Sequence, residues 1–227
     1  MNDTALSPPD LADTTPASPT DLAVHARGLV KTFGDLRAVD GVDLEVRRGE
    51  VFGVLGPNGA GKTTVLKMLS TLLPIDGGEA EVFGVDVRTR GHAVRRLLGV
   101  TGQYASVDET LTGRENLWLF GRLQGLSRTR AGRTADDLLE QFGLQDAAEQ
   151  PISQFSGGMR RRLDLAASLI TRPPLIFLDE PTTGLDPRTR GQMWETVRTL
   201  VARGNTVLLT THDPDRADQR PHPIPVI

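Results

Sequence analysis

Apolar and polar positions along the chain follow two periodicities, which predict strands and helices in alternation. Between residues 42 and 46, Val and Leu alternate with acidic side chains, which is typical of a strand with one face in water. The runs at 51–55 and 175–178 are continuously apolar, so each predicts a strand buried on both faces. Residues 206–210 form the last predicted strand. Strands that alternate with helices in this way indicate a mainly parallel sheet in an α/β fold.

Helical periodicity fills the segments between these strands. The first predicted helix follows the glycine-rich segment 56–61 and ends before Pro74. Ser156 is predicted to cap a second helix, while Asp186 and Pro187 are favourable N-cap and N1 residues of a third. The predicted inward-facing residues are Val65, Met68, Leu69 and Leu72 in the first helix, Leu163, Ala166, Ala167 and Ile170 in the second, and Met193, Val197, Leu200 and Val201 in the third.

The segment 110–155 contains no convincing strand pattern. It indicates helices around 115–123 and 135–142, which glycines interrupt. Together with the helix that follows Ser156, this stretch predicts an inserted helical subdomain at about residues 104–172. The glycines expected to break these helices are Gly121, Gly125 and Gly143.

Both ends of the chain differ in composition from the middle. Residues 1–22 are rich in Asp, Ser, Thr and Pro and precede the first basic residue, Arg27, so they predict a disordered tail rather than a secretory signal. Prolines at alternate positions within 220–227 forbid a helix and remove the donors that a central strand needs. The folded domain is therefore expected at 23–219, followed by a divergent Pro-rich end.

The overall composition excludes several classes of site. The 227 residues carry 26 basic and 29 acidic side chains, and the net charge of -3 argues against a general affinity for nucleic acid. There is no cysteine, which excludes disulfides, cysteine zinc sites and thiol nucleophiles. No apolar run approaches the roughly 18 residues that would cross a bilayer. A membrane role would therefore depend on a partner chain.

The glycine-rich segment continues into a match to the phosphate-loop pattern of Gly, four residues, then Gly-Lys-Thr. Its glycines let backbone N–H groups converge on phosphate oxygens, and the following helix directs its positive end toward them. Lys62 is expected to reach the β- and γ-phosphates and Thr63 to hold Mg²⁺. A chance match is expected in about one of a hundred chains of this size, and the flanking strand and helix make it rarer. The predicted nucleotide-binding residues are Gly56, Pro57, Asn58, Gly59, Ala60, Gly61, Lys62, Thr63 and Thr64.

Two carboxylates, Asp179 and Glu180, follow the apolar strand at 175–178. Placed beside the strand 51–55 in a parallel sheet, this strand would bring Asp179 near the metal, because Mg²⁺ prefers carboxylates, waters and phosphate oxygens. Glu180, one residue further on, would polarise a water. Taken alone, the two residues would more often be a surface acidic pair at a strand end, and the phosphate loop upstream reverses that balance.

The segment 155–163, Phe-Ser-Gly-Gly-Met-Arg-Arg-Arg-Leu, resembles the signature of ATP-binding cassette ATPases, and it precedes the acidic strand at that family's spacing. The other motifs of the family occur in order. Gln103 resembles the Q-loop glutamine, residues 184–186 resemble the D-loop, and His212 resembles the switch histidine. Phe33 matches the aromatic residue that stacks on adenine.

The resemblance, which covers residues 24–219, implies a P-loop NTPase fold with a mainly parallel central sheet, an N-terminal antiparallel β portion and an inserted helical signature subdomain. It also implies hydrolysis of MgATP between two copies of the chain arranged head to tail, so that turnover depends on closure. Glu180 is the candidate general base, and His212 would position the attacking water. The implied sets are catalytic Glu180, His212 and Gln103; metal-binding Thr63, Gln103 and Asp179; adenine-stacking Phe33; D-loop Asp186; and Ser156, Gly157 and Gly158, which would face the ATP of the opposite subunit.

Within this family, residues 102–117 and 156–169 are similar to daunorubicin-resistance-type drug-export ATPases of actinobacteria. The similarity implies a separate integral membrane permease. The chain would then act as a homodimer of nucleotide-binding domains at the cytoplasmic face of the cell membrane and power export of a drug-like or other small hydrophobic compound. The run of Arg160, Arg161 and Arg162 is expected to be a solvated helix face, and no nucleic-acid partner is expected.

The sequence departs from the common cassette pattern at several places. Met159 stands where many members have Gln, Phe155 where they have Leu, and Phe33 where Tyr is commoner. The residues after 219 depart from the helix and strands with which the family continues, which indicates a truncated or divergent copy. Two rival interpretations are a cassette ATPase that acts on nucleic acid or ribosomes, and a nucleotide-binding module that does not hydrolyse ATP. A small-molecule P-loop kinase is disfavoured by the signature and the switch histidine.

Overall fold

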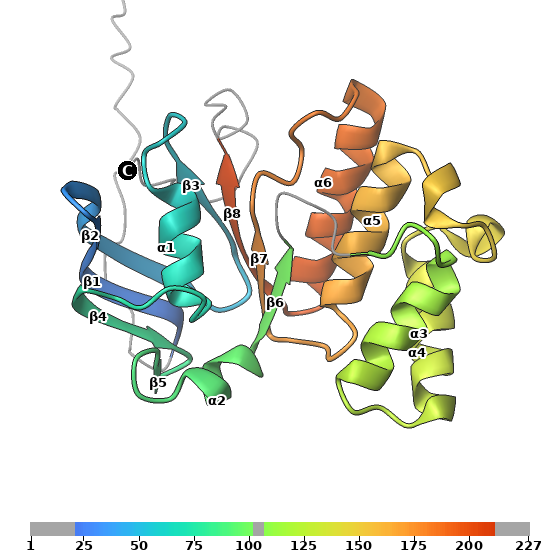
Figure 1. The fold of residues 1–227 in the computed structure, drawn as a ribbon, viewed down its shortest axis with the longest axis horizontal. Helices are drawn as coiled ribbons and strands as arrows, with labels where there is room; N and C mark the ends of the chain where they lie inside the picture. Colours follow the sequence, from blue (N-terminus) through green and yellow to red (C-terminus); the bar gives the residue numbers. More distant parts are fainter. Residues whose placement is uncertain (1–20, 102–106, 212–227) are drawn as a thin grey trace, which may run out of the picture.

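The computed structural model describes residues 21–101 and 107–211 (Figure 1). The expected Pro-rich end falls outside these residues, and so does the expected N-terminal tail apart from Asp21 and Leu22. Gln103 and His212 also lie outside them. The described residues form two four-stranded sheets and a helical region.

The first part of the chain forms an antiparallel sheet. Its strands are β1 (Leu22–Phe33), β2 (Leu36–Arg47), β4 (Gly77–Val82) and β5 (Val85–Asp86), in the order β2-β1-β4-β5. A two-residue turn joins β1 to β2, and Gly34 in that turn has a φ of 58°, which favours glycine. The expected antiparallel β portion is therefore confirmed. β1 begins at Leu22, a residue that the sequence analysis assigned to the disordered tail.

A parallel sheet carries the strands that end at the candidate site. It consists of β3 (Val51–Leu55), β8 (Thr206–Thr211), β7 (Leu175–Leu178) and β6 (Leu98–Thr101), in that order and all parallel. The strands predicted from the apolar runs are all present. The expectation that the strand 175–178 lies beside 51–55 is wrong, because β8 pairs with both strands and separates them.

Four helices directly follow or precede strands of this sheet along the chain: α1 (Lys62–Leu69), α2 (Gly91–Arg95), α5 (Gly157–Ser168) and α6 (Pro187–Ala202). Val65, Met68 and Leu69 of α1 are fully buried, as the periodicity predicts. The predicted inward position of Leu72 is wrong, since its side chain is 63% exposed. The reason is that α1 ends at Leu69 and Thr71 takes a φ of 64°, which breaks the helical path.

The helical region lies at the end of the molecule opposite to β1 and β2 (Figure 1). It contains α3 (Gly113–Leu123), α4 (Arg128–Gln141) and the short 3-10 helices η2 (Gln145–Ala147) and η3 (Ile152–Gln154). Gly121 does not break α3 as expected, because it packs inside the helix, where a Cβ would come 3.1 Å from the Cβ of Ala131 in α4. Gly125 and Gly143 do follow helix ends, with φ values of 85° and 61°. Within residues 21–101 and 107–211, no helix combines the length and apolar character that crossing a membrane requires.

Two hydrophobic clusters meet at the parallel sheet. One includes the helical region, and the other includes the antiparallel sheet and α1. Successive residues of β7 alternate between them, with Ile176 and Leu178 in the first cluster and Leu175 and Phe177 in the second. None of these four side chains is more than 1% exposed. β7 is therefore buried on both faces, as its continuous apolar run predicts.

Candidate nucleotide site

The phosphate loop connects the end of β3 to the start of α1. Gly59 and Gly61 both have a φ of 85°, a conformation that residues with a side chain rarely adopt. Gly61 is also confined by β2, because a Cβ at that position would lie 2.4 Å from the carbonyl oxygen of Ala38. Glycine is therefore required at position 61 by the backbone conformation and by the close approach of a neighbouring strand.

The Lys62 side chain is held inside this loop. It is only 5% exposed, and its ammonium donates to the carbonyl oxygens of Gly56 at 2.7 Å and Pro57 at 2.8 Å. An ammonium has three donors, so two of them are directed at the backbone of the loop itself. The positive charge of Lys62 is thereby fixed within the phosphate loop.

The N-terminus of α1 offers backbone donors beside this charge. The first hydrogen bond within the helix runs from the N–H of Val65 to the carbonyl of Gly61 at 2.9 Å, so the amides of residues 62–64 precede the helical ladder. The first turn contains no acidic residue. The helix dipole and these N–H groups make this end of α1 suited to an anion such as phosphate.

Thr63, in the first turn of α1, lies against the carboxylate that follows β7. Its hydroxyl is 3.1 Å from Oδ1 and 2.9 Å from Oδ2 of Asp179. The structure therefore brings the phosphate loop and the acidic strand end together, although β8 separates their strands. Hydroxyl and carboxylate oxygens are hard donors that Mg²⁺ prefers together with phosphate oxygens and water, so these two residues fit Mg²⁺. Gln103, the third expected ligand, lies outside the described residues.

Glu180 has a backbone conformation that is uncommon for a residue with a side chain, with a φ of 48°. Its N–H donates to Oγ1 of Thr210 at 2.9 Å, and the same hydroxyl donates to Oδ1 of Asp179 at 2.6 Å. The hydroxyl of Thr183 donates to Oε2 of Glu180 at 3.1 Å. Groups from β8 and from the loop after β7 therefore fix both neighbouring carboxylate residues.

Two residues that the sequence motifs did not predict also contact this strand end. Thr210 is fully buried on β8, and Arg161 of α5 donates through Nη2 to the carbonyl oxygen of Asp179 at 2.8 Å. Burial lowers the pKa of Arg161, while the charges of Asp164 and Asp179 oppose that shift. A polar residue at the end of a buried strand is a signal that could have pointed to Thr210. The run of three arginines contains no comparable signal for the middle one.

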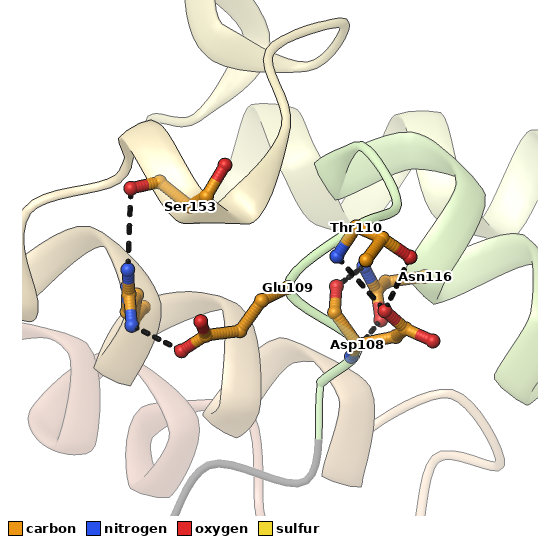
Figure 2. Close-up of polar contacts among 6 residues, drawn as sticks. Asp108, Glu109, Thr110, Asn116 and Ser153 are labelled. Carbon is orange, nitrogen blue, oxygen red and sulfur yellow. Dashed lines mark hydrogen bonds and ion pairs between the residues drawn. The ribbon is translucent and has the colours of Figure 1, made fainter.

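This arginine run is not the solvated face that the sequence suggests. Arg160 bonds the carboxylate of Glu109 at 2.6 Å and the carbonyl of Ser153 at 3.3 Å, as the dashed lines to these two residues show (Figure 2). Arg162 donates to the carbonyl of Phe142 at 2.9 Å. The expectation is wrong because each guanidinium reaches an oxygen of the surrounding chain. The run therefore ties α5 to its neighbours in the fold.

The start of α3 is anchored by a buried amide, also drawn in Figure 2. Asn116 is 1% exposed, and its Nδ2 donates to the carbonyls of Asp108 and Thr112, both at 3.0 Å. Its Oδ1 accepts from the N–H of Asp108 at 2.8 Å. The hydroxyl and N–H of Thr110 bond the Asp108 carboxylate and lower its pKa. These bonds fix the segment that follows residue 107 against the helical region.

The signature segment forms the start of α5. Ser156 is its N-cap, and the Ser156 hydroxyl accepts from the N–H of Met159 at 3.2 Å. The two glycines that follow have different surroundings. A Cβ on the exposed Gly157 would meet nothing within 4 Å, whereas a Cβ on Gly158 would lie 2.3 Å from Cγ2 of Thr189 in α6. Gly158 thus allows α5 to approach α6 closely, while the backbone of Gly157 has no neighbour over it.

The predicted D-loop residue Asp186 caps α6. Its Oδ1 accepts from the N–H of Thr189 at 3.0 Å, and hydrogen bonds from the Thr189 side chain and backbone lower the pKa of Asp186. Because Thr189 also touches Gly158, one residue connects the D-loop to the signature.

Phe33 lies at the end of β1, where its ring is 46% exposed and its backbone pairs with Leu36 across the turn. The ammonium of Lys31 is 5.5 Å from the ring centroid and 2.8 Å from Oδ1 of Asp76. The carbonyl of Ala38, two residues after Leu36 in β2, lies against Gly61. Phe33 therefore lies at the end of the strand pair that borders the phosphate loop.

Comparisons with known proteins agree with this arrangement. Residues 39–183 match the ABC transporter family. The chain is 58% identical over 205 residues to the daunorubicin/doxorubicin resistance ATP-binding protein DrrA of Streptomyces peucetius, covering 90% of this chain and 62% of that protein. It is 50% identical over 200 residues to the doxorubicin resistance ATP-binding protein DrrA of Mycobacterium tuberculosis, covering 87% of this chain and 60% of that protein.

The fold has close counterparts among solved structures. A crystal structure of the ADP conformation of an ATP-binding cassette of an ABC transporter is similar, with a TM-score of 0.81 and 25% identity over 91% of this chain and 87% of that chain. The chain spans 62% and 60% of the length of the two curated relatives. With a family match over more than half of its residues, a phosphate loop against an acidic strand end, and relatives at this identity, the chain belongs to the ABC transporter family.

Proposed function

We propose that this chain binds ATP together with Mg²⁺ and hydrolyses it. The observation that carries the proposal is the contact between Thr63 at the start of α1 and Asp179 after β7, next to the buried ammonium of Lys62. One place thus combines backbone donors for phosphate, a fixed positive charge and oxygen ligands for a metal. When bound, Mg²⁺ would neutralise charge on the phosphate oxygens.

Glu180 is the proposed general base in this reaction. Its carboxylate would accept a proton from the attacking water while the water oxygen bonds to the γ-phosphorus and the bond to the bridging oxygen of ADP breaks. His212 would position this water and the γ-phosphate, and Gln103 would assist with the metal. The amides at the start of α1 and Lys62 would hold the phosphates throughout.

A second copy of the chain would complete each site. We infer that Ser156, Gly157 and Gly158 face the γ-phosphate held by the partner and that Phe33 stacks on the adenine. The exposed backbone of Gly157 supports this role, since the N-terminus of α5 presents N–H groups there. Asp186 would lie at the same interface.

We further propose that turnover powers export of a drug-like compound through a separate integral membrane permease. The names of the two relatives describe ATP-binding proteins of daunorubicin and doxorubicin resistance, and the identity of 58% and 50% supports a shared role. The chain would then act at the cytoplasmic face of the membrane. Stimulation of its ATPase by a co-reconstituted permease and drug would support this role, and the absence of any stimulation would contradict it.

Nucleotide binding and turnover of the purified chain test the core of the proposal. Lys62→Ala should lose ATP binding or turnover, and Lys67→Ala, which removes an exposed lysine from the same helix, is the matched control. Glu180→Gln should retain ATP binding and lose roughly 10²- to 10⁴-fold in turnover, the usual share of a general base. Full turnover in either the Lys62 or the Glu180 variant would refute the assigned role.

A further inference from the structure

The peptide unit between Asp179 and Glu180 is held at both of its polar groups. Its carbonyl oxygen accepts from Nη2 of Arg161 at 2.8 Å, and its N–H donates to Oγ1 of Thr210 at 2.9 Å. The two partners come from different elements, α5 and β8. Because the peptide unit is planar, it cannot rotate without breaking one of these bonds. Arg161 and Thr210 therefore form a clamp that fixes its orientation.

The Thr210 hydroxyl has a second role in this clamp. It donates to Oδ1 of Asp179 at 2.6 Å while it accepts from the N–H of Glu180. A hydroxyl has one donor hydrogen and two lone pairs, so both bonds can form at once. Thr210 is 0% exposed, and β-branching restricts its rotamer. A single oxygen atom thus links the proposed metal ligand to the backbone of the proposed general base.

The conformation of Glu180 gives this link its importance. Its φ of 48° lies in a region that residues with a side chain rarely occupy, and such conformations persist only where surrounding contacts enforce them. The N–H that donates a hydrogen bond to the Thr210 hydroxyl is that of Glu180 itself. Loss of the bond would allow the peptide to turn and carry the Glu180 carboxylate away from its present place.

We propose that Thr210 is a positioning residue for ATP hydrolysis, which acts with Arg161 to fix the Asp179–Glu180 peptide and thereby the direction of the Glu180 carboxylate. This inference rests on the proposed ATPase activity and adds a residue to it. Thr210 holds Glu180 through the backbone and touches neither ATP nor the attacking water in this role. It therefore affects the rate of the chemical step more than the affinity for nucleotide.

Thr210→Val tests the proposal, because valine has nearly the shape of threonine and replaces the hydroxyl with a methyl group that can neither donate nor accept a hydrogen bond. We expect kcat to fall by about 10- to 100-fold, the effect of a small misplacement of a reacting group, with ATP affinity within about 3-fold of the parent. Thr210→Ser keeps the hydroxyl and should recover most of the rate. Thr210→Ala serves as a second hydroxyl-free variant if Thr210→Val does not fold.

Thr206→Val is the matched control at the other end of β8. The Thr206 side chain is also buried, at 1% exposure, and its hydroxyl accepts from the N–H of Gly49 at 2.9 Å. The variant therefore loses a buried hydroxyl from the same strand without touching the clamp. Its kcat should stay near that of the parent even if its melting temperature falls.

A measurement without nucleotide separates the clamp from the proposed activity. The amide hydrogen exchange of Glu180, followed by NMR, should accelerate at least about 10-fold in Thr210→Val and not in Thr206→Val, since only the former removes the acceptor. Unchanged exchange, unchanged kcat in Thr210→Val, or an equal loss of kcat in Thr206→Val would each overturn the inference. If the parent chain fails to bind or hydrolyse ATP, the proposed function falls together with the assigned role of Thr210, while the exchange result still tells whether the clamp exists.

Discussion

Replacing Gly158 by alanine places a methyl group in the contact between α5 and α6. The added Cβ would lie 2.3 Å from Cγ2 and 3.2 Å from Oγ1 of Thr189, inside the separation of about 3.5–4.0 Å at which carbon atoms attract. Thr189 is β-branched and stands in the first turn of α6, so it has few rotamers with which to withdraw. We expect overpacking to lower the free energy of unfolding by about 1–3 kcal/mol.

Two further variants isolate this clash. Gly157→Ala adds the same methyl group where nothing lies within 4 Å, so it reports the gain in helix propensity of up to about 1 kcal/mol without a clash. Thr189→Ser removes Cγ2 and leaves the backbone N–H that bonds Asp186. The double variant Gly158→Ala/Thr189→Ser should therefore recover most of the stability lost in Gly158→Ala.

Urea unfolding of the parent, the single variants and the double variant gives the interaction energy between the two positions. We expect this energy to be about 1–2 kcal/mol in favour of the double variant, well above the roughly 0.5 kcal/mol scatter of independent sites. If the effects of the Gly158 and Thr189 substitutions simply add, contact with Thr189 is not the reason for glycine at position 158. ATP turnover of Gly157→Ala, whose stability is retained, would report the proposed role of the exposed backbone separately.

Three other predictions concern Gly61 in the phosphate loop, Asn116 in α3 and Asp76 beside Lys31. Gly61→Ala should abolish ATP binding and lower the melting temperature, because its Cβ would meet a carbonyl oxygen of β2 at 2.4 Å; an ATP titration with the parent affinity would contradict this. Asn116→Ala should lower the free energy of unfolding by about 2 kcal/mol, since a buried amide loses three hydrogen bonds; an unchanged urea midpoint would contradict it. The hydrogen bond from Lys31 lowers the pKa of Asp76, so this carboxylate stabilises the fold above the ordinary aspartate range, and its contribution disappears as the pH falls through the lowered value. Asp76→Asn should melt below the parent at pH 7, and the difference should shrink below about pH 4; melting curves that stay parallel across this range would refute the argument.

Local patterns predicted much of the fold. The continuous apolar runs gave the bounds of β3 and β7, and Ser156 and Asp186 do cap the helices that follow them. β6 could not be found in this way, because its four residues include a glycine and show no alternation. The order of the parallel strands could not be predicted either, because it depends on how distant segments pair and not on any local pattern.

The site was predicted as a set of motifs, and the structure supplies the contacts between them. The sequence suggested a metal site at Thr63 and Asp179, and their side chains do lie in contact. It could not show that Thr210 joins Asp179 to Glu180, because that link depends on β8 lying next to β7. The same limit explains the error for the arginine run, whose partners are distant in sequence and become neighbours only in the fold.

The position of β8 sets the width of the proposed nucleotide site. Neighbouring strands lie about 4.8 Å apart, so the intervening strand keeps the ends of β3 and β7 about 10 Å from each other. The loop that leaves β3 must cross this gap to bring Thr63 to Asp179. A larger side chain at position 210 would displace the Asp179 carboxylate, which the Thr210 hydroxyl contacts at 2.6 Å, without altering a single residue that binds phosphate.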